Sequence, residues 1–130
     1  MTTILIVDDS QTQRHILSDL LGQHKFTIWT AANGLEAIKQ IRQQSPDLIV
    51  LDLIMPQLNG YELCRLLKTN PSTRDIPIII CSAKGTNVDR YWGLKQGADA
   101  YIAKPFHAHE LVETIQQLLA ESSSMGLLGG

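Results

Sequence analysis

The sequence predicts an α/β protein in which five parallel strands form one doubly wound sheet of order 2-1-3-4-5. Short apolar runs of strand length alternate along the chain with longer segments in which apolar residues recur at helical spacing. This strict alternation is typical of a parallel sheet that is covered by helices on both faces. Three of the runs are apolar throughout, as expected of central strands, and right-handed crossovers then select the strand order.

The predicted strands differ in composition in a way that places each of them in the sheet. The first, third and fourth runs (ILIV, LIVL and IIIC) are apolar at every position, so helices are expected to cover both of their faces. The second and fifth runs (FTIWTA and AYIA) are mixed, which suits the two edges of the sheet. In chain order, the strands are expected at residues 4–7, 26–31, 48–51, 78–81 and 100–103.

Between the strands, apolar residues recur three and four positions apart and predict five helices. Ser10 and Asn33 each precede a Gln or Glu by three residues, as the first residue of a capping box does. Gly22 and Gly97 stand where helices are expected to end. In chain order, the helices are expected at residues 10–23, 33–44, 59–69, 87–96 and 106–121.

Length and composition fit one folded domain. The chain has 130 residues, of which 44% are hydrophobic and 18% charged, as in an ordinary globular protein. The net charge is -2 and there is no basic run, so nucleic acid and acidic membranes are not expected as partners. We expect residues 1–121 to form the domain and residues 122–130 (SSSMGLLGG) to form a flexible C-terminal tail.

The protein is expected to be cytoplasmic and not inserted into a membrane. The N-terminal sequence MTTILIVDDS has only a short apolar run before two acids, which is too little for a signal peptide. No apolar run approaches the roughly 20 residues of a membrane-spanning helix. Cys64 and Cys81 have neither the spacing of a zinc site nor that of a disulfide framework, so we expect buried free thiols.

Polar side chains gather where four of the predicted strands end. Asp8 and Asp9 follow the first strand, Asp52 follows the third, Ser82 the fourth and Lys104 the fifth. The carboxyl ends of parallel strands meet at one edge of the sheet, and the functional crevice of such a fold lies there. Each residue taken alone could be a helix cap, a turn residue or a solvated strand end. Their joint occurrence favours a functional site.

We expect these side chains to bind a cation and a phosphoryl group. Crowded carboxylates repel one another, so they either hold protons or bind a cation. Because no His or Cys accompanies them, their oxygen atoms favour a hard ion, Mg²⁺ or Mn²⁺. Lys104 and Ser82 offer an ammonium group and a hydroxyl group to a phosphoryl group. Asp52, the central acid, is best placed to be the nucleophile that forms an aspartyl phosphate.

Over residues 3–121, the chain resembles the receiver domain of two-component response regulators, a flavodoxin-like fold. As a stand-alone receiver domain, it is similar to the chemotaxis response regulator. The resemblance lies in the segments ILIVDDS, DLIVLDLIMPQLNGYEL, IPIIICSAK and GADAYIAKPF. It implies that Asp52 accepts a phosphoryl group from a histidine kinase. It also implies that Mg²⁺ is bound by Asp9, Asp52 and the backbone carbonyl of Ile54, with Asp8 assisting through water.

The same resemblance implies a conformational switch. Ser82 and Lys104 are expected to hold the phosphoryl group, and the peptide bond between Lys104 and Pro105 is expected to be cis. Phosphorylation is expected to draw the Ser82 hydroxyl inward and let Tyr101 turn into the vacated space. This changes the face formed by the fourth helix, fifth strand and fifth helix, where a downstream protein docks. The chain is expected to be a monomer or a weak, phosphorylation-dependent dimer. Alternatively, Tyr101 is only a half-buried edge residue.

Two positions depart from the chemotaxis pattern. Ile54, two residues after Asp52, replaces a polar residue, and Lys84, two residues after Ser82, replaces an acid. In the family, both positions flank the path of the hydrolytic water. Because an apolar Ile54 is expected to exclude that water, we hypothesise a comparatively long-lived phosphoryl form.

The predicted fourth helix carries two adjacent aromatic residues, Tyr91 and Trp92. Either both pack against the sheet, or Trp92 is partly exposed and anchors a partner. The segment YWGLKQGADAYIAKPF resembles receivers of type IV pilus systems in twitching motility and phototaxis. That resemblance implies a role in motility or taxis control.

Three other functions fit parts of the pattern. A haloacid-dehalogenase-like phosphatase also uses an aspartyl nucleophile, but its signature has a second acid at the position of Ile54. A nucleotide- or flavin-binding domain is disfavoured because neither G-x-G-x-x-G nor G-x-x-x-x-G-K-[ST] follows a strand. A degenerate receiver that binds partners without phosphate is the third, and the complete set of acids with Lys104 argues against it. We therefore expect a switch rather than an enzyme.

Overall fold

The computed structural model describes residues 2–128, with side chains described for residues 2–122. Five parallel strands form one sheet in the order β2-β1-β3-β4-β5, which confirms the predicted order. The strands are β1 (Thr3–Val7), β2 (Thr27–Ala31), β3 (Leu48–Leu51), β4 (Ile78–Ser82) and β5 (Ala100–Ala103). The helices are α1 (Gln11–Gly22), α2 (Gly34–Gln43), α3 (Gly60–Thr69), α4 (Asn87–Lys95) and α5 (Ala108–Leu128).

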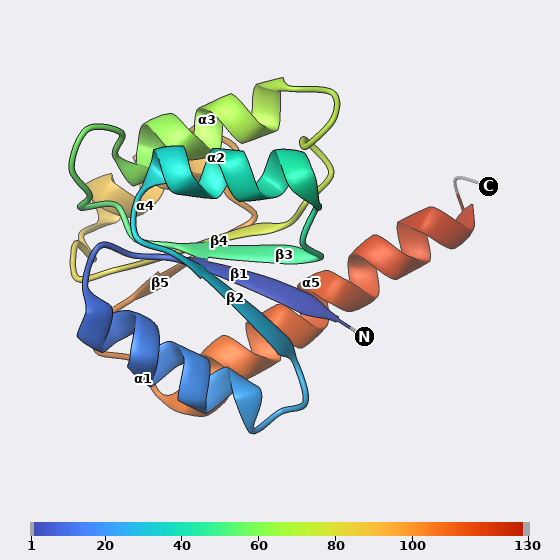
Figure 1. Cartoon of the computed structure of the whole chain (residues 1–130), viewed down its shortest axis with the longest axis horizontal. Coiled ribbons are helices and arrows are strands. Elements are labelled where there is room, and N and C mark those ends of the chain that lie inside the picture. The colour runs from blue at the N-terminus through green and yellow to red at the C-terminus, as the bar shows by residue number, and fades with distance from the viewer. Residues whose placement is uncertain (1, 129–130) are drawn as a thin grey trace.

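Helices cover both faces of the sheet. Helices α1 and α5 lie on one face, and α2, α3 and α4 lie on the other (Figure 1). Along β1, Leu5 and Val7 point into the core beneath α2 and α3, whereas Ile4 and Ile6 point into the core beneath α1 and α5. All four side chains are fully buried, which is the physical reason that a central strand must be apolar at every position.

The strand register brings the ends of the strands to one edge. Val7 pairs with Leu51 across β1 and β3, and Leu51 pairs with Ile80 across β3 and β4. On the other side of β4, Ser82 pairs with Ala103 of β5. The residues that follow β1, β3 and β5 are therefore neighbours in space.

Hydrogen-bonded caps begin helices α1 to α4. The side chains of Ser10 and Asn33 accept bonds from the backbone three residues later, at Gln13 and Glu36, as predicted. Reciprocal capping boxes also form between Asn59 and Glu62 at α3 and between Thr86 and Asp89 at α4. These two boxes were not among the sequence predictions, although both have the required spacing.

Helix α5 is longer than predicted. Its backbone continues to Leu128, past the expected end at Glu121, and Figure 1 shows this part extending beyond the sheet. The next four residues, SSSM, contain neither Gly nor Pro, so nothing in the local sequence ends the helix there. Of the predicted tail, residues 129–130 lie outside the described part of the chain, and the division between domain and tail stays a prediction.

Both cysteines are buried free thiols, as predicted. Burial raises the pKa of Cys64 to about 11 and that of Cys81 to about 12.

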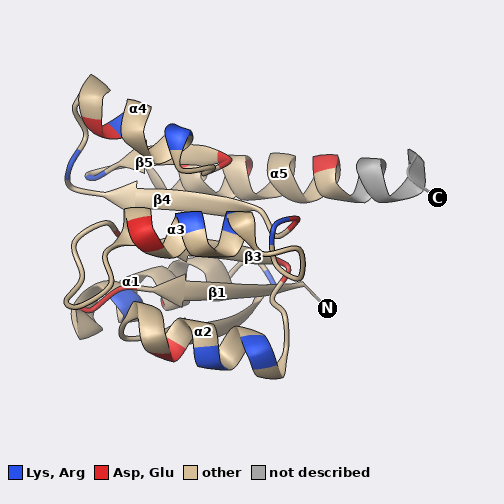
Figure 2. Cartoon of the chain, turned by 90° about the horizontal axis from the view of Figure 1, so that it is seen from above, with Lys and Arg blue, Asp and Glu red and all other residues tan. Residues whose placement is uncertain are grey.

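Acidic and basic residues are mixed along the outer helices, and α2 and α3 each carry both kinds (Figure 2). Among the described residues, no helix is both long and apolar enough to span a membrane.

Candidate functional site

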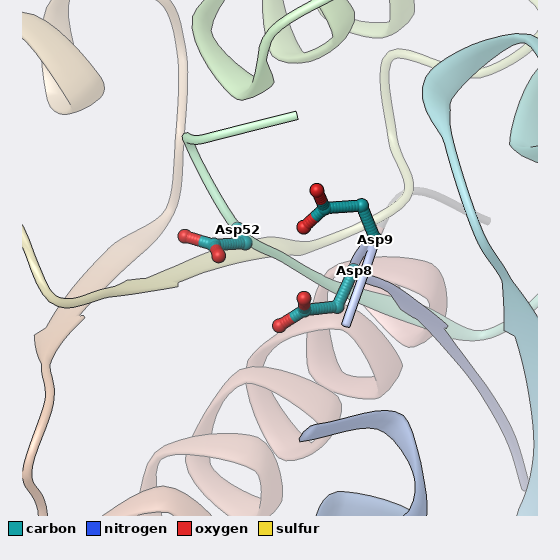
Figure 3. A group of neighbouring side chains, drawn as sticks. All are labelled: Asp8, Asp9 and Asp52. Atoms are coloured by element: carbon teal, nitrogen blue, oxygen red, sulfur yellow. The ribbon is translucent and has the colours of Figure 1, made fainter. Parts of the chain in front are cut away.

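Three carboxylates meet at the carboxyl ends of β1 and β3. One oxygen from each of Asp8, Asp9 and Asp52 lies within 4.8 Å of the others, and Figure 3 shows the three groups side by side. Asp8 is buried, Asp52 is partly buried and Asp9 is exposed. The sequence-predicted acids are therefore brought together as expected, with one edge of the group open to solvent.

Both carboxylate oxygens and the backbone carbonyl of Asp8 have polar partners. Its Oδ1 atom accepts a hydrogen bond from the Ser10 backbone at 2.9 Å, and its Oδ2 atom lies 3.3 Å from Nζ of Lys104. The Asp8 backbone carbonyl accepts a 2.7 Å bond from the guanidinium group of Arg14. The bonds from Ser10 and Lys104 compensate the burial of the carboxylate, since Asp8 is only 2% exposed.

Asp52 has one engaged oxygen and one available oxygen. Its Oδ1 atom accepts a 2.7 Å hydrogen bond from the backbone of Leu53. Its Oδ2 atom lies 4.0 Å from Nζ of Lys104, and the described residues give it no hydrogen bond. Of the three acids, Asp52 thus combines partial burial with a free oxygen beside a cation.

Lys104 reaches the site from the end of β5. Its backbone N–H donates a 2.8 Å bond to the Ser82 carbonyl, which anchors the residue to β4. The peptide bond to Pro105 is cis, as the resemblance implied. Lys104 also borders an apolar groove of about 570 Å³ that is lined by Ile16, Leu17 and Phe106.

Ser82 and Tyr101 both bind the peptide groups of Lys84. The Ser82 hydroxyl oxygen accepts a 3.3 Å bond from the Lys84 N–H, and the Tyr101 hydroxyl donates to the Lys84 carbonyl. Ser82 is fully buried and Tyr101 is 8% exposed, so Tyr101 is not the half-buried edge residue of the alternative interpretation. Burial raises the pKa of Tyr101 to about 12, which keeps its hydroxyl protonated and able to donate.

Ile54 lies at the rim of the site. It lines a pocket of about 230 Å³ together with Asn59, Tyr61 and Lys84. The Ile54 side chain is 54% exposed, so an apolar surface faces solvent beside the acids. No contact in the structure tests the expected role of its backbone carbonyl.

The donor set fits a hard divalent cation. The candidate side-chain ligands are the carboxylate oxygens of Asp8, Asp9 and Asp52, without His or Cys. Of the described residues, Lys104 is the one that brings an ammonium group within 4.0 Å of these carboxylates, so a bound cation would offset their remaining repulsion. Asp8, Asp9 and Asp52 are the residues that would hold it.

Two supporting residues escaped the sequence analysis. Arg14 bonds the Asp8 carbonyl, and Gly60 begins α3 directly against β3, with its N–H donating a 3.0 Å bond to the Leu53 carbonyl. A Cβ atom on Gly60 would lie 2.8 Å from the Leu53 Cα. Nothing in the residues around Gly60 in the sequence indicates that its backbone lies against Leu53. Only the packed structure reveals it.

The sequence left open whether Tyr91 and Trp92 of α4 pack against the sheet or are exposed, and the structure shows that both are exposed. Tyr91 is 57% exposed and Trp92 is 48% exposed, and their rings meet edge to face with centroids 5.5 Å apart. They pack against each other rather than against the sheet.

Comparison with known proteins identifies the family of this chain. The family model described as the response regulator receiver domain matches residues 4–116. Protein PilH of Pseudomonas aeruginosa is 39% identical over 120 residues, which cover 92% of this chain and 99% of PilH. The alkaline phosphatase synthesis transcriptional regulatory protein SphR of Synechococcus elongatus is 41% identical. The match covers 93% of this chain but only 50% of SphR, so the chain spans about half the length of that relative.

Solved structures share the fold. The signal receiver domain of a signal transduction histidine kinase from Syntrophus aciditrophicus has a TM-score of 0.87 at 36% identity, covering 93% of this chain and 92% of that one. The chemotaxis protein CheY4 of Vibrio cholerae has a TM-score of 0.84 at 28% identity, covering 91% of this chain and 98% of that one.

Proposed function

The chain belongs to the response regulator receiver family, and we propose that it is a phosphorylation switch in which Asp52 is the phosphoacceptor. Receiver domains take a phosphoryl group from a histidine kinase, bind Mg²⁺ at a cluster of aspartates and bind downstream partners. They are generally signalling switches rather than classical enzymes. The observation that carries the assignment of Asp52 is its free Oδ2 atom beside Lys104, whereas both oxygens of Asp8 are engaged.

In the proposed reaction, Oδ2 of Asp52 attacks phosphorus and forms a new oxygen–phosphorus bond. The bond from phosphorus to the donor's leaving atom breaks, and the leaving atom keeps the electron pair. Lys104 and Ser82 hold the phosphoryl oxygens by charge and by hydrogen bonding. The Ser82 hydroxyl oxygen accepts from the Lys84 N–H, so its own hydrogen is available to donate to a phosphoryl oxygen.

Mg²⁺ is the proposed cofactor, with Mn²⁺ as the other ion that suits oxygen ligands. Asp9, Asp52 and the backbone carbonyl of Ile54 would bind it directly, with Asp8 assisting through water. When bound, it neutralises the acids and the incoming phosphoryl group.

The output of the switch is proposed to be the face formed by α4, β5 and α5. Tyr101 and Ser82 meet at the Lys84 peptide groups, so movement of one hydroxyl alters the partner of the other. The exposed Tyr91 and Trp92 give this face an apolar anchor for a downstream protein. Phosphorylation selects between two arrangements of this face.

The cellular setting is also a proposal. The similarity to Protein PilH and the resemblance of the segment 91–106 to pilus-system receivers support a stand-alone regulator of motility or taxis. The similarity to a chemotaxis protein in structure supports the same setting. We place the protein in the cytoplasm as a monomer or a weak phosphorylation-dependent dimer.

Mass spectrometry after incubation with acetyl phosphate and Mg²⁺ tests the proposal. The wild type should gain one phosphoryl group, and both Asp52→Asn and treatment with EDTA should abolish it. Asp75→Asn, at an exposed acid outside the site, is the matched control and should keep it. No adduct on the wild type would indicate a phosphate-independent binding module. Rapid turnover of phosphomonoesters would indicate a phosphatase.

A further inference from the structure

Helix α4 comes close to the sheet at a glycine, Gly93. Of the nine residues of α4, all of them described, only Gly93 is buried. Val88, Tyr91, Trp92 and Leu94 are each about half or more exposed. Because so little of α4 is buried, the position of this helix relative to the sheet depends on the side chain that packs beneath Gly93.

The Tyr101 ring lies beneath Gly93. A Cβ atom at position 93 would lie 2.7 Å from Cδ2 and 3.0 Å from Cε2 of Tyr101, and 3.1 Å from Cδ1 of Ile80. The first distance is shorter than the van der Waals contact of two carbon atoms. A side chain at position 93 would therefore overlap the buried Tyr101 ring.

Other contacts hold the ring in this place. The Tyr101 hydroxyl donates to the Lys84 carbonyl at the start of the loop that leads to α4. The guanidinium carbon of Arg90, also on α4, lies 5.7 Å from the centre of the ring, and its Nη1 donates a 3.4 Å bond to the Tyr101 carbonyl. Tyr101 is therefore bonded both to the loop that leads to α4 and to α4 itself.

We propose that Gly93 is the positioning residue of the switch: its missing side chain is the space that admits the Tyr101 ring beneath α4. Movement of the ring and movement of α4 are thereby coupled, since the two elements share one volume. This inference rests on the proposed function for its signalling role, but the shared volume itself is independent of phosphorylation.

The effect of Gly93→Ala on stability, measured with and without the Tyr101 ring, tests whether the two residues share one volume. With Tyr101 present, Gly93→Ala should lower the urea midpoint of unfolding because the new methyl group displaces the ring. In a Tyr101→Ala background, the same change should raise the midpoint, as replacing glycine inside a helix normally does. A Tyr101→Phe background should behave like the wild type, because the ring and not the hydroxyl fills the space.

Gly22→Ala is the matched control. Gly22 ends α1, and a Cβ atom there meets nothing within 4 Å, so its effect should have the same sign in all three backgrounds. If Gly93→Ala changes the midpoint in the same direction with and without the Tyr101 ring, the proposal is overturned.

A spectroscopic measurement separates positioning from mere stability. In protein labelled with 3-fluorotyrosine, the resonance of Tyr101 should shift towards that of exposed fluorotyrosine in Gly93→Ala and stay in place in Gly22→Ala. An unchanged Tyr101 resonance in Gly93→Ala would overturn the inference. Failure of Asp52 to accept phosphate would refute the proposed function and leave these results intact, so the two failures are distinguishable.

Discussion

The Nζ atom of Lys104 lies 3.3 Å from Oδ2 of Asp8, closer than the 4.0 Å that separates it from Oδ2 of Asp52. Both members of the closer pair are largely buried, with side chains 16% and 3% exposed. Lys104 thus compensates the buried charge of Asp8, the most buried of the three acids. It also remains close enough to contact a phosphoryl group attached to Asp52.

Lys104→Met is expected to lower the free energy of unfolding by about 3 kcal/mol without Mg²⁺, because it leaves the buried Asp8 charge unpaired. Urea denaturation with EDTA measures the loss. Adding Mg²⁺ should recover more stability in the variant than in the wild type, since the acids then lack their internal cation. Lys39→Met, at an exposed position on α2, is the control, and an equal loss in both variants would contradict the expectation.

Ile54→Asn is expected to speed dephosphorylation several-fold, because a polar side chain at the rim of the pocket can bind the attacking water that Ile54 excludes. The rate is measured as loss of the phosphoryl adduct after removal of acetyl phosphate. Leu66→Asn, which changes a similarly exposed apolar residue on α3, should leave the rate unchanged. An unchanged rate in Ile54→Asn would remove the hypothesis of water exclusion.

Gly60→Ala is expected to destabilise the protein by about 1–3 kcal/mol, because the added Cβ would press on the backbone carbonyl of Asp52 and on the Cα of Leu53. The same displacement should slow phosphorylation of Asp52, the preceding residue. Urea denaturation and the acetyl phosphate assay measure the two effects. Gly22→Ala, in open space, should be neutral or slightly stabilising, and equal behaviour of the two variants would argue against the contact.

The cysteines give a pH dependence. Burial raises the pKa of Cys64 to about 11 and that of Cys81 to about 12, from a usual value of 9.0. The folded state therefore holds these protons more tightly, and this stabilisation is complete below pH 9 and is lost as pH rises towards 11–12. At pH 8, the native thiols should resist iodoacetamide and become reactive in urea. Fast labelling of the native protein would contradict the burial.

The predicted sheet order and the gathering of the acids rest on local features. The apolar composition of β1, β3 and β4 follows from burial on both faces, and parallel strands must end at one edge. The end of α5 was predicted too early, because a run of serines after Glu121 weakens a helix without terminating it.

The sequence by itself determined the layered architecture, the strand order and the set of residues at the strand ends, because these depend on patterns within each segment. Only the tertiary structure decided which oxygen of Asp52 is free, that Arg14 bonds the Asp8 carbonyl, and that Gly93 makes room for Tyr101. These relationships join segments that are distant in the chain or residues whose side chains must first be packed. Their distances are set by how the helices pack on the sheet, which no local pattern encodes.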